Sequence, residues 1–192
     1  MYIIFEGIEG TGKSTLARSL SQRLVKYHPY VDMFNGWEGE LRLNGRERSP
    51  IPGVGDAAED LAVMYFVHAT GASAIQDRGL VSALVYREAR GERLPVEGWW
   101  DKVWSMVPRT VVVHVKRDIE ACLAVREAGP FGRYRLERED AIFDKVVAAL
   151  PVRTIIVNND GNIDGAVETI WGELYRISPS VGGLRPAPAR LP

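Results

Sequence analysis

The sequence has very few of the residues that hold disulfide-rich or zinc-bound folds together. Its 192 residues include a single cysteine, Cys122, and three histidines that stand far apart at positions 28, 68 and 114. One cysteine excludes an internal disulfide framework and a cysteine-rich zinc site, which fits a protein of the reducing cytoplasm. We therefore expect a cytoplasmic location, a buried and inert Cys122 thiol, and a hydrogen-bonded core histidine at His114.

Long apolar runs and an excess of one charge are also missing. No apolar stretch approaches the ~20 residues that a membrane-spanning helix needs, and the start of the sequence does not resemble a signal peptide. The formal net charge is -1, with basic residues scattered along the chain, which argues against a nucleic-acid track. We expect neither a membrane nor a nucleic acid as partner, and any bound polyanion should be small.

Strand-like apolar runs alternate with helical patterns along most of the chain. The runs occupy residues 2–5, 30–34, 74–75, 111–115 and 154–157. Apolar residues at helical spacing lie between and after them, for example Leu16, Leu20 and Leu24. Strands that alternate with helices form a parallel sheet covered on both faces. We therefore predict a three-layer α/β fold with a five-stranded parallel sheet.

The length of the chain allows one substantial core but not two ordinary domains. We place one domain over residues 1–177 and a tail over residues 178–192, which carries several prolines after the last helical pattern. Residues 35–55 are rich in glycine, arginine and proline without clear periodicity. We interpret them as a long loop that lines a substrate site.

The first strand-like run leads into a glycine-rich segment with a strong functional signal. Residues 7–14 read Gly-Ile-Glu-Gly-Thr-Gly-Lys-Ser and fit the P-loop pattern G-x-x-x-x-G-K-[ST] between a strand and a helix. Its backbone N–H groups and the following helix N-terminus would cradle phosphate. The expected nucleotide-binding residues here are Gly7, Gly10, Thr11, Gly12, Lys13, Ser14 and Thr15. Lys13 should reach the β- and γ-phosphates of ATP, and the Ser14 hydroxyl should bind Mg²⁺.

A second candidate site follows the third strand-like run. Asp77 comes directly after residues 74–76, so its carboxylate should lie at the carboxyl edge of the sheet. There it would hold magnesium through water or orient the attacking group. Arg78 beside it would clamp a phosphate. A surface ion pair is the alternative reading of these two residues.

Three blocks of residues together resemble the thymidylate kinases, within the nucleoside monophosphate kinases. The blocks are residues 5–15; Asp77 and Arg78 with Ser82, Ala83 and Tyr86; and residues 135–139 with Phe143 and Val146. The resemblance spans residues 1 to about 175 and implies a P-loop NTPase fold with ATP and Mg²⁺ as cofactors. It implies phosphorylation of a deoxynucleoside monophosphate, with dTMP to dTDP as the leading reaction. It also implies a homodimer, for which the tryptophan-rich residues 99–104 are an interface candidate.

The resemblance further implies roles for individual residues. Glu9 would face the acceptor sugar, and Arg78 would contact the acceptor phosphate. Residues 126–136 would form a short lid over the phosphates. Within it, Arg126 and Arg133 would stabilise charge on the transferred phosphoryl group, or they are ordinary solvated charges.

The base-binding residues are where the chain departs from the family. Residues 34–38 read Phe-Asn-Gly-Trp-Glu, whereas many bacterial thymidylate kinases carry Arg-Glu-Pro-Gly-Gly. Phe66 aligns with the residue that stacks on thymine, although a helical phenylalanine is more often part of the core. Ala69 and Thr70 stand where an Asp-Arg pair usually reads the base. The resemblance places adenine beside Asn158, in the loop after the last strand.

Two other functions are compatible with a P-loop. A deoxynucleoside kinase has a neutral hydroxyl as acceptor, so Arg78 would have no acceptor phosphate to hold; such kinases tend to carry Glu-Arg-Ser at this place. A nucleotide-binding switch or regulatory ATPase needs a water-positioning residue and a partner-facing switch segment. We identify neither of these two features in the sequence.

Overall fold

The computed structural model of the protein describes residues 1–25, 31–35, 54–71, 73–91, 99–125 and 132–177. The expected tail, most of the predicted 35–55 loop, Arg126 and the first part of the predicted lid lie outside these residues.

Parallel strands form one sheet in the order β2-β3-β1-β4-β5. The strands are β1 (Tyr2–Glu6), β2 (Val31–Asn35), β3 (Ser73–Asp77), β4 (Thr110–Lys116) and β5 (Arg153–Asn158). The register sets Phe5 beside Asp77 and Glu6 beside His114. The carboxyl ends of β1, β3 and β4 therefore meet at one edge of the sheet, where ligands bind in α/β folds. The predicted parallel α/β architecture is confirmed.

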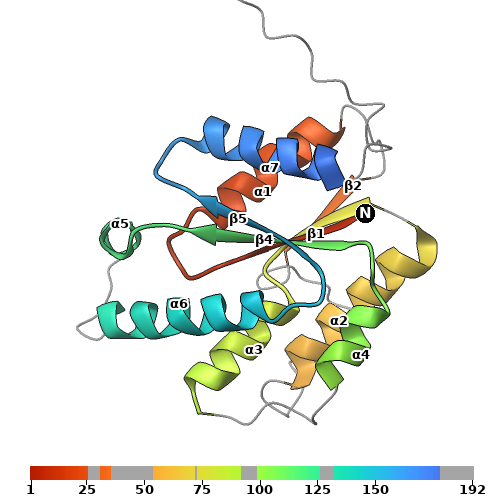
Figure 1. Ribbon diagram of the computed structural model, residues 1–192, viewed down its shortest axis with the longest axis horizontal. Coiled ribbons are helices and arrows are strands. Elements are labelled where there is room, and N and C mark those ends of the chain that lie inside the picture. The colour runs from red at the N-terminus through yellow and green to blue at the C-terminus, as the bar shows by residue number, and fades with distance from the viewer. Residues whose placement is uncertain (26–30, 36–53, 72, 92–98, 126–131, 178–192) are drawn as a thin grey trace, which may run out of the picture.

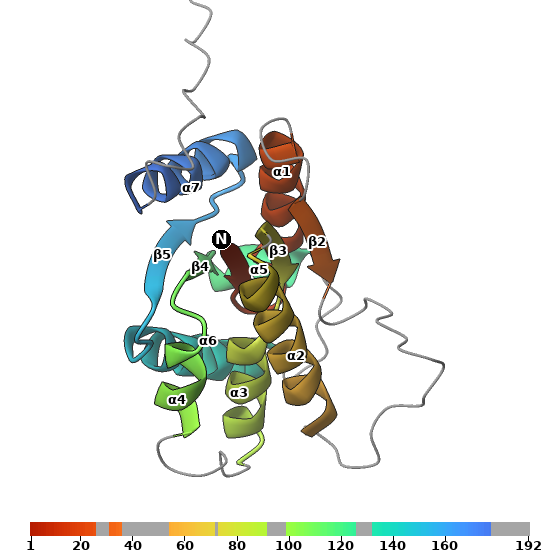
Figure 2. The ribbon, with the colours of Figure 1, turned by 90° about the vertical axis from the view of Figure 1, so that its right-hand side faces the viewer.

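Helices cover both faces of the sheet (Figures 1 and 2). They are α1 (Lys13–Val25), α2 (Val54–Thr70), α3 (Leu80–Ala89), α4 (Trp99–Ser105), α5 (Ile119–Ala124), α6 (Gly132–Ala148) and α7 (Ile163–Ile177). Helices α1 and α7 pack on one face, while α2, α3, α4 and α6 pack on the other. Among the described residues, no helix has both the length and the apolar character to cross a membrane.

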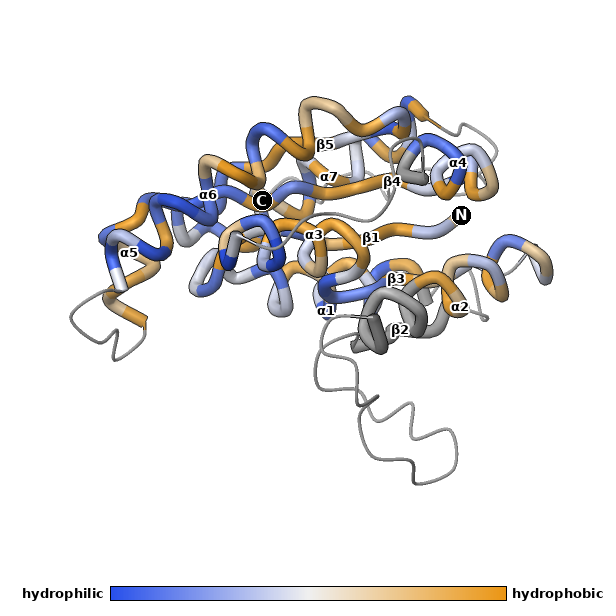
Figure 3. The backbone as a smooth tube through the Cα atoms, turned by 90° about the horizontal axis from the view of Figure 1, so that it is seen from below, coloured by the Kyte–Doolittle hydropathy of each residue, from blue (hydrophilic) through white to orange (hydrophobic). Residues whose placement is uncertain are grey.

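The central strands bury apolar side chains on both faces, as expected for a sheet between two helical layers. In β1, Ile3 and Phe5 pack against α1 and α7. Tyr2 and Ile4 pack into the opposite layer, which contains α3 and α6. Figure 3 shows the hydrophobic colour concentrated along β4 in the middle of the molecule. Because alternate strand residues share a face, Glu6 follows Tyr2 and Ile4 and lies on the side of α3.

Three residues considered in the sequence have clear places in the core. Cys122 is buried, as expected. Trp104 of α4 is only 1% exposed, so this tryptophan packs inside the chain and is not available for an interface. His114 is fully buried and stacks on Phe143 with 5.7 Å between ring centroids. Neither ring nitrogen has a hydrogen-bond partner within the described part of the chain, so the expected hydrogen-bonded histidine is not what the structure shows.

Candidate active site

The turn between β1 and α1 has the conformation that its glycines require. Gly7, Gly10 and Gly12 have φ angles of 145°, 84° and 82°, a region that glycine adopts without the steric cost of a side chain. A Cβ at Gly7 would stand 2.4 Å from the Val115 carbonyl oxygen, and one at Gly12 would stand 2.4 Å from Asn159 Nδ2. The turn therefore needs glycine for space as well as for conformation.

Lys13 begins α1 and is almost completely buried under this turn. Its side chain is 5% exposed, and Nζ donates a hydrogen bond to the Ile8 carbonyl oxygen at 2.9 Å. The Thr11 hydroxyl donates to the same carbonyl at 3.0 Å. Burial, with help from the nearby charge of Arg78, lowers the pKa of Lys13 to about 7. A bound phosphate would favour the charged ammonium, because an opposite charge nearby stabilises it.

Asn159 holds the P-loop from the side of β5. It is 2% exposed, and its Nδ2 donates to the Thr11 carbonyl oxygen at 2.7 Å. Asn158, which we expected to reach the nucleotide, is exposed at the end of β5. Neighbouring residues at a strand end point in different directions, so only one of the two asparagines turns toward the loop. The turn-forming sequence at residues 158–161 does not by itself distinguish them.

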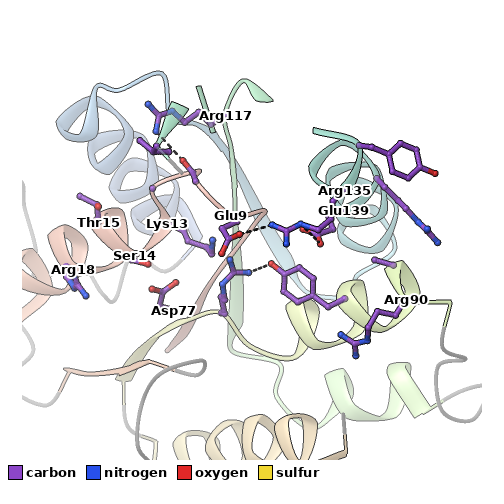
Figure 4. Close-up of a pocket in the computed structure, with 18 residues that line it drawn as sticks. Glu9, Lys13, Ser14, Thr15, Arg18, Asp77, Arg90, Arg117, Arg135 and Glu139 are labelled. Carbon is purple, nitrogen blue, oxygen red and sulfur yellow. Dashed lines mark hydrogen bonds and ion pairs between the residues drawn. The ribbon is translucent and has the colours of Figure 1, made fainter. Parts of the chain in front are cut away.

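Asp77 and Ser14 bring two oxygen-bearing side chains to the same space as Lys13 (Figure 4). Asp77 is 7% exposed, and its Oδ1 has no hydrogen-bond partner in the described structure. A buried carboxylate oxygen without a partner is costly, and a cation would relieve that cost. Carboxylate and hydroxyl oxygens are ligands that Mg²⁺ accepts, together with phosphate and water. These two residues therefore fit a magnesium ion.

Arg78 follows Asp77 and has a left-handed backbone, with φ at 64°. Its backbone N–H donates to the Phe5 carbonyl oxygen at 2.9 Å. In the guanidinium, Nη1 donates to the Gly7 carbonyl oxygen at 3.4 Å and to the Tyr86 hydroxyl. Burial raises the pKa of Tyr86 to about 12, so this hydroxyl stays neutral. The guanidinium is thus held beside the P-loop.

Glu6 is an acidic residue for which the sequence predicted no role. It ends β1 and is 0% exposed. Burial raises the pKa of Glu6 to about 7, although the hydrogen bond from Ser82 and the positive charges of Arg78 and Lys13 act in the opposite direction. The sequence did contain a signal for such a role: an acidic residue that follows the apolar run of residues 2–5 and directly precedes the glycine-rich turn.

Lys13, Ser14, Asp77 and Arg78 line one cleft of about 870 Å³, which is within the usual size of small-molecule sites. Its basic lining residues are Lys13, Arg18, Arg78, Arg90, Arg117, Arg135 and Arg138, and its acidic ones are Glu9, Asp77 and Glu139. Basic side chains outnumber acidic ones, although the whole chain has a net charge of -1. The cleft therefore concentrates positive charge and suits a small polyanion.

Arg135 of α6 crosses the cleft toward the P-loop. Its Nη2 donates to Glu9 Oε2 at 2.9 Å, and its Nε lies 3.6 Å from Glu139 Oε1. Arg133, which we expected at the transferred phosphoryl group, pairs instead with Glu120. It is not among the described residues that line the cleft. Residues two apart on a helix face different sides. Arg133 has a glutamate at i+4, Glu137, just as Arg135 has Glu139, so the spacing of charges in the sequence does not show which arginine reaches the cleft.

Phe66 lies on α2 and is 59% exposed. Among the described lining residues the aromatic ones are Tyr86 and Tyr134, so Phe66 is absent from this part of the cleft. The structure therefore places Phe66 neither in the core nor at a described base site.

No protein-family model and no curated protein sequence matches the chain. Among solved structures, the YorR protein of Bacillus subtilis in complex with phosphorylated GDP is similar with a TM-score of 0.65 and 19% identity, covering 96% of this chain and 99% of that one. A thymidylate kinase from Ehrlichia chaffeensis is similar with a TM-score of 0.59 and 15% identity, and the match covers 91% of this chain and 98% of that one. Deoxyadenosine kinase from M. mycoides, with dCMP and dCDP bound, is similar with a TM-score of 0.55 and 14% identity, and the match covers 92% of this chain and 100% of that one. The chain therefore shares the P-loop fold of these structures, two of which are a thymidylate kinase and a deoxyadenosine kinase, as the sequence resemblance implied.

Proposed function

We propose that the protein is a nucleoside monophosphate kinase that transfers the γ-phosphate of ATP to a deoxynucleoside monophosphate, with dTMP as the first candidate. One observation carries the proposal: Lys13, at the start of α1, and Arg78, directly after β3, line the same cleft. A cleft with two separate cationic groups can hold two phosphorylated reactants at once. Holding them in line supplies much of the catalysis in phosphoryl transfer.

The donor side is the P-loop. Its backbone N–H groups and Lys13 would hold the β- and γ-phosphates, and Thr15 would contact the nucleotide at the start of α1. Asn159 would support this side through its hydrogen bond to the Thr11 carbonyl. When bound, Mg²⁺ neutralises phosphate charge, and Ser14 and Asp77 would hold it.

The acceptor side is formed by Arg78 and Glu9. Arg78 would bind the acceptor phosphate, and Glu9 would face the acceptor sugar. Glu9 and Glu139 hold Arg135 over the cleft, which makes Arg135 a further candidate for stabilising the transferred phosphoryl group. Arg126 and Arg133 remain proposals for that role, and Arg133 would have to leave Glu120 to perform it.

A deoxynucleoside kinase is the second candidate, because one structural neighbour is a deoxyadenosine kinase. Its acceptor would present a hydroxyl where a monophosphate kinase acceptor presents a phosphate. The guanidinium of Arg78 beside the P-loop favours the phosphorylated acceptor, since arginine binds phosphate with paired, charge-assisted hydrogen bonds.

The direct test is to incubate the protein with ATP, Mg²⁺ and a panel of nucleosides and nucleoside monophosphates, and to identify the products by mass. We expect one deoxynucleoside diphosphate to accumulate. Accumulation of a monophosphate from a nucleoside would replace the proposal with a nucleoside kinase. ADP formation without any phosphorylated acceptor would indicate an ATPase.

Two variants and a matched control locate the activity. Lys13→Ala and Arg78→Ala should each lower kcat/KM by roughly 100-fold or more, because each removes a charge that holds a reacting phosphate. Arg153 is an exposed arginine of β5 and is not among the described residues lining the cleft, so Arg153→Ala should keep near-normal turnover. Near-normal turnover in Lys13→Ala or Arg78→Ala would contradict the assigned roles.

We also propose that the protein is cytoplasmic, because a single cysteine suits a reducing compartment, and that it is a homodimer, on the basis of the family resemblance. The burial of Trp104 restricts the interface candidates in α4 to its remaining residues. Sedimentation at micromolar concentration should give a dimer mass, and a monomer mass would remove this part of the proposal.

A further inference from the structure

Helix α3 begins without a capping side chain of its own. Its N-cap residue is Gly79, and no side-chain hydrogen bond is made from that position. The first N–H groups of a helix need acceptors from elsewhere. At this end the acceptor comes from another element: Glu6 Oε1, at the end of β1, accepts the Gly79 N–H at 3.0 Å.

The second carboxylate oxygen of Glu6 completes a two-point contact with α3. The Ser82 hydroxyl, three residues after the N-cap, donates to Glu6 Oε2. In a capping box, a glutamate at this third position reaches back to the N-cap N–H. Here a serine occupies that position, and the carboxylate is supplied by the neighbouring strand. Glu6 therefore caps α3 across the sheet edge.

The capped residues directly follow Arg78, whose left-handed backbone is strained for a residue with a side chain and persists only where neighbouring groups hold it. On one side, the Arg78 N–H donates to the Phe5 carbonyl. On the other, Gly79 is held by Glu6 and packs so closely that an added Cβ would lie 3.0 Å from Ile4 Cγ2. The end of β1 thus fixes both peptide groups that flank Arg78 Cα.

We propose that Glu6 is a positioning residue for the acceptor phosphate: by capping α3 from β1, it fixes the turn that aims the Arg78 guanidinium into the cleft. This inference rests on the proposed function, since it assumes that Arg78 receives the acceptor. Glu6 itself is completely buried and is not among the described residues that line the cleft. It acts through Gly79 and Ser82.

Removing Glu6 has two possible effects on anion binding, and they have opposite signs. A carboxylate near the cleft repels a phosphate, so its removal would strengthen anion binding. Loss of the cap would instead let Arg78 move and weaken binding. The sign of the change therefore distinguishes positioning from a simple electrostatic effect.

The test compares Glu6→Leu, which has similar bulk and no acceptor, with Glu6→Gln, whose amide oxygen can still accept the Gly79 N–H. With dTMP as probe, Glu6→Leu should raise the Kd and the acceptor KM by about tenfold or more, as expected when a buried donor loses its partner. Glu6→Gln should stay within about threefold of the wild type, and the KM for ATP should change by less than about threefold in both variants. Thr110→Val is the control, because its buried hydroxyl has no partner in the described structure and lies at the opposite end of the sheet.

Two results would overturn the proposal. One is equal or tighter dTMP binding by Glu6→Leu, which would mean that only the charge of Glu6 is felt. The other is an equal loss in Glu6→Leu and Glu6→Gln, which would mean that the hydrogen bond to Gly79 does not set the position of Arg78.

A second readout needs no substrate and separates this inference from the proposed function. Hydrogen exchange at the Gly79 amide should be about tenfold faster or more in Glu6→Leu and close to wild type in Glu6→Gln. Unchanged exchange in Glu6→Leu overturns the cap. If the Gly79 amide loses protection in Glu6→Leu but the wild-type protein does not bind dTMP, the cap is supported and dTMP is removed as the acceptor.

Ser82→Ala keeps the proposal testable if Glu6→Leu does not fold. It removes the second contact with Glu6 and should raise both the dTMP Kd and the Gly79 exchange rate by about threefold or more. Wild-type values for both would contradict the proposal.

Discussion

At the scale of single residues, Arg78 combines a strained backbone with the side chain that we assign to the acceptor phosphate. Its φ of 64° is the only positive value recorded for a non-glycine residue among those described. Strain of this kind is often found where a functional side chain must point in a fixed direction. The strain and the proposed binding role can be separated by substitution.

Arg78→Gly and Arg78→Ala lose the same guanidinium and differ chiefly in their tolerance of a left-handed backbone. We expect the free energy of unfolding of Arg78→Gly to exceed that of Arg78→Ala by about 1 kcal/mol. Both variants should fail to bind the acceptor. Urea unfolding of the two proteins measures the difference, and an alanine variant as stable as the glycine variant would show that the turn relaxes without its left-handed residue.

Asn158 and Asn159 form a second pair of matched residues. Asn159→Ala removes the hydrogen bond from Nδ2 to the buried Thr11 carbonyl, so it should lower the free energy of unfolding by about 1–2 kcal/mol and weaken ATP binding. Asn158 is exposed, and Asn158→Ala should change stability by less than about 0.5 kcal/mol. Equal effects in thermal unfolding and ATP titration would contradict the support that we assign to Asn159.

At the scale of elements, the packing of α6 on β4 contains a buried group that titrates. His114 of β4 stacks on Phe143 of α6, with Asp144 Oδ1 3.9 Å from its Nδ1. Burial lowers the pKa of His114 to about 4; the charge of Asp144 acts against this, and that of Lys116 adds to it. The folded state thus binds a proton at His114 less readily than the unfolded state.

This shift predicts a loss of stability in mild acid. Because the unfolded chain takes up the proton first, His114 destabilises the fold as pH falls from about 6.5 to about 4. Between pH 7 and pH 5 its share is about 2 kcal/mol. His114→Leu leaves no hydrogen-bond partner unsatisfied and removes the titrating group. The free energy of unfolding of this variant should therefore fall less between pH 7 and pH 5 than that of the wild type. Parallel pH dependence in wild type and variant, measured by urea unfolding, would contradict the assignment.

The elements were predictable to the extent that local pattern determines them. Apolar strand runs and the P-loop pattern identified β1 and the turn to α1, because steric and hydrogen-bonding needs there are local. Which side chains reach the cleft depends on their exact position in a helix or strand, because a shift of one or two residues turns a side chain to another face. Arg135 contacts Glu9 of the P-loop, whereas Arg133 was the expected partner of the transferred phosphoryl group. Asn159 contacts the P-loop, whereas its neighbour Asn158 was the residue expected beside adenine.

The role of Glu6 was beyond a reading of local pattern for a different reason. Its contacts are with Gly79 and Ser82, more than seventy positions away in the sequence. They become visible only when β1 and β3 pair and α3 starts above them. Phe66 shows the same limit, since its exposure on α2 depends on which helix face meets the sheet.

At the scale of the whole molecule, the charges are nearly balanced overall and unevenly placed. The net charge of -1 accompanies a cleft whose described lining is mainly basic. A concave site focuses such a field on small anions, and the topology explains its position. Strands β1, β3 and β4 end at the same edge, so the P-loop, Asp77 and Arg78 converge although they are far apart in the sequence.

The central claim is that this one cleft holds two phosphorylated ligands, the first on Lys13 and the second on Arg78. A crystal structure with a bisubstrate analogue, in which adenosine and thymidine are joined by a 5′,5′-polyphosphate chain, tests it most directly. We predict that the adenosine-side phosphates contact the P-loop and Lys13 Nζ while the thymidine-side phosphate contacts the Arg78 guanidinium. An analogue bound with its thymidine end in solvent and Arg78 still turned to Gly7 and Tyr86 would contradict the account.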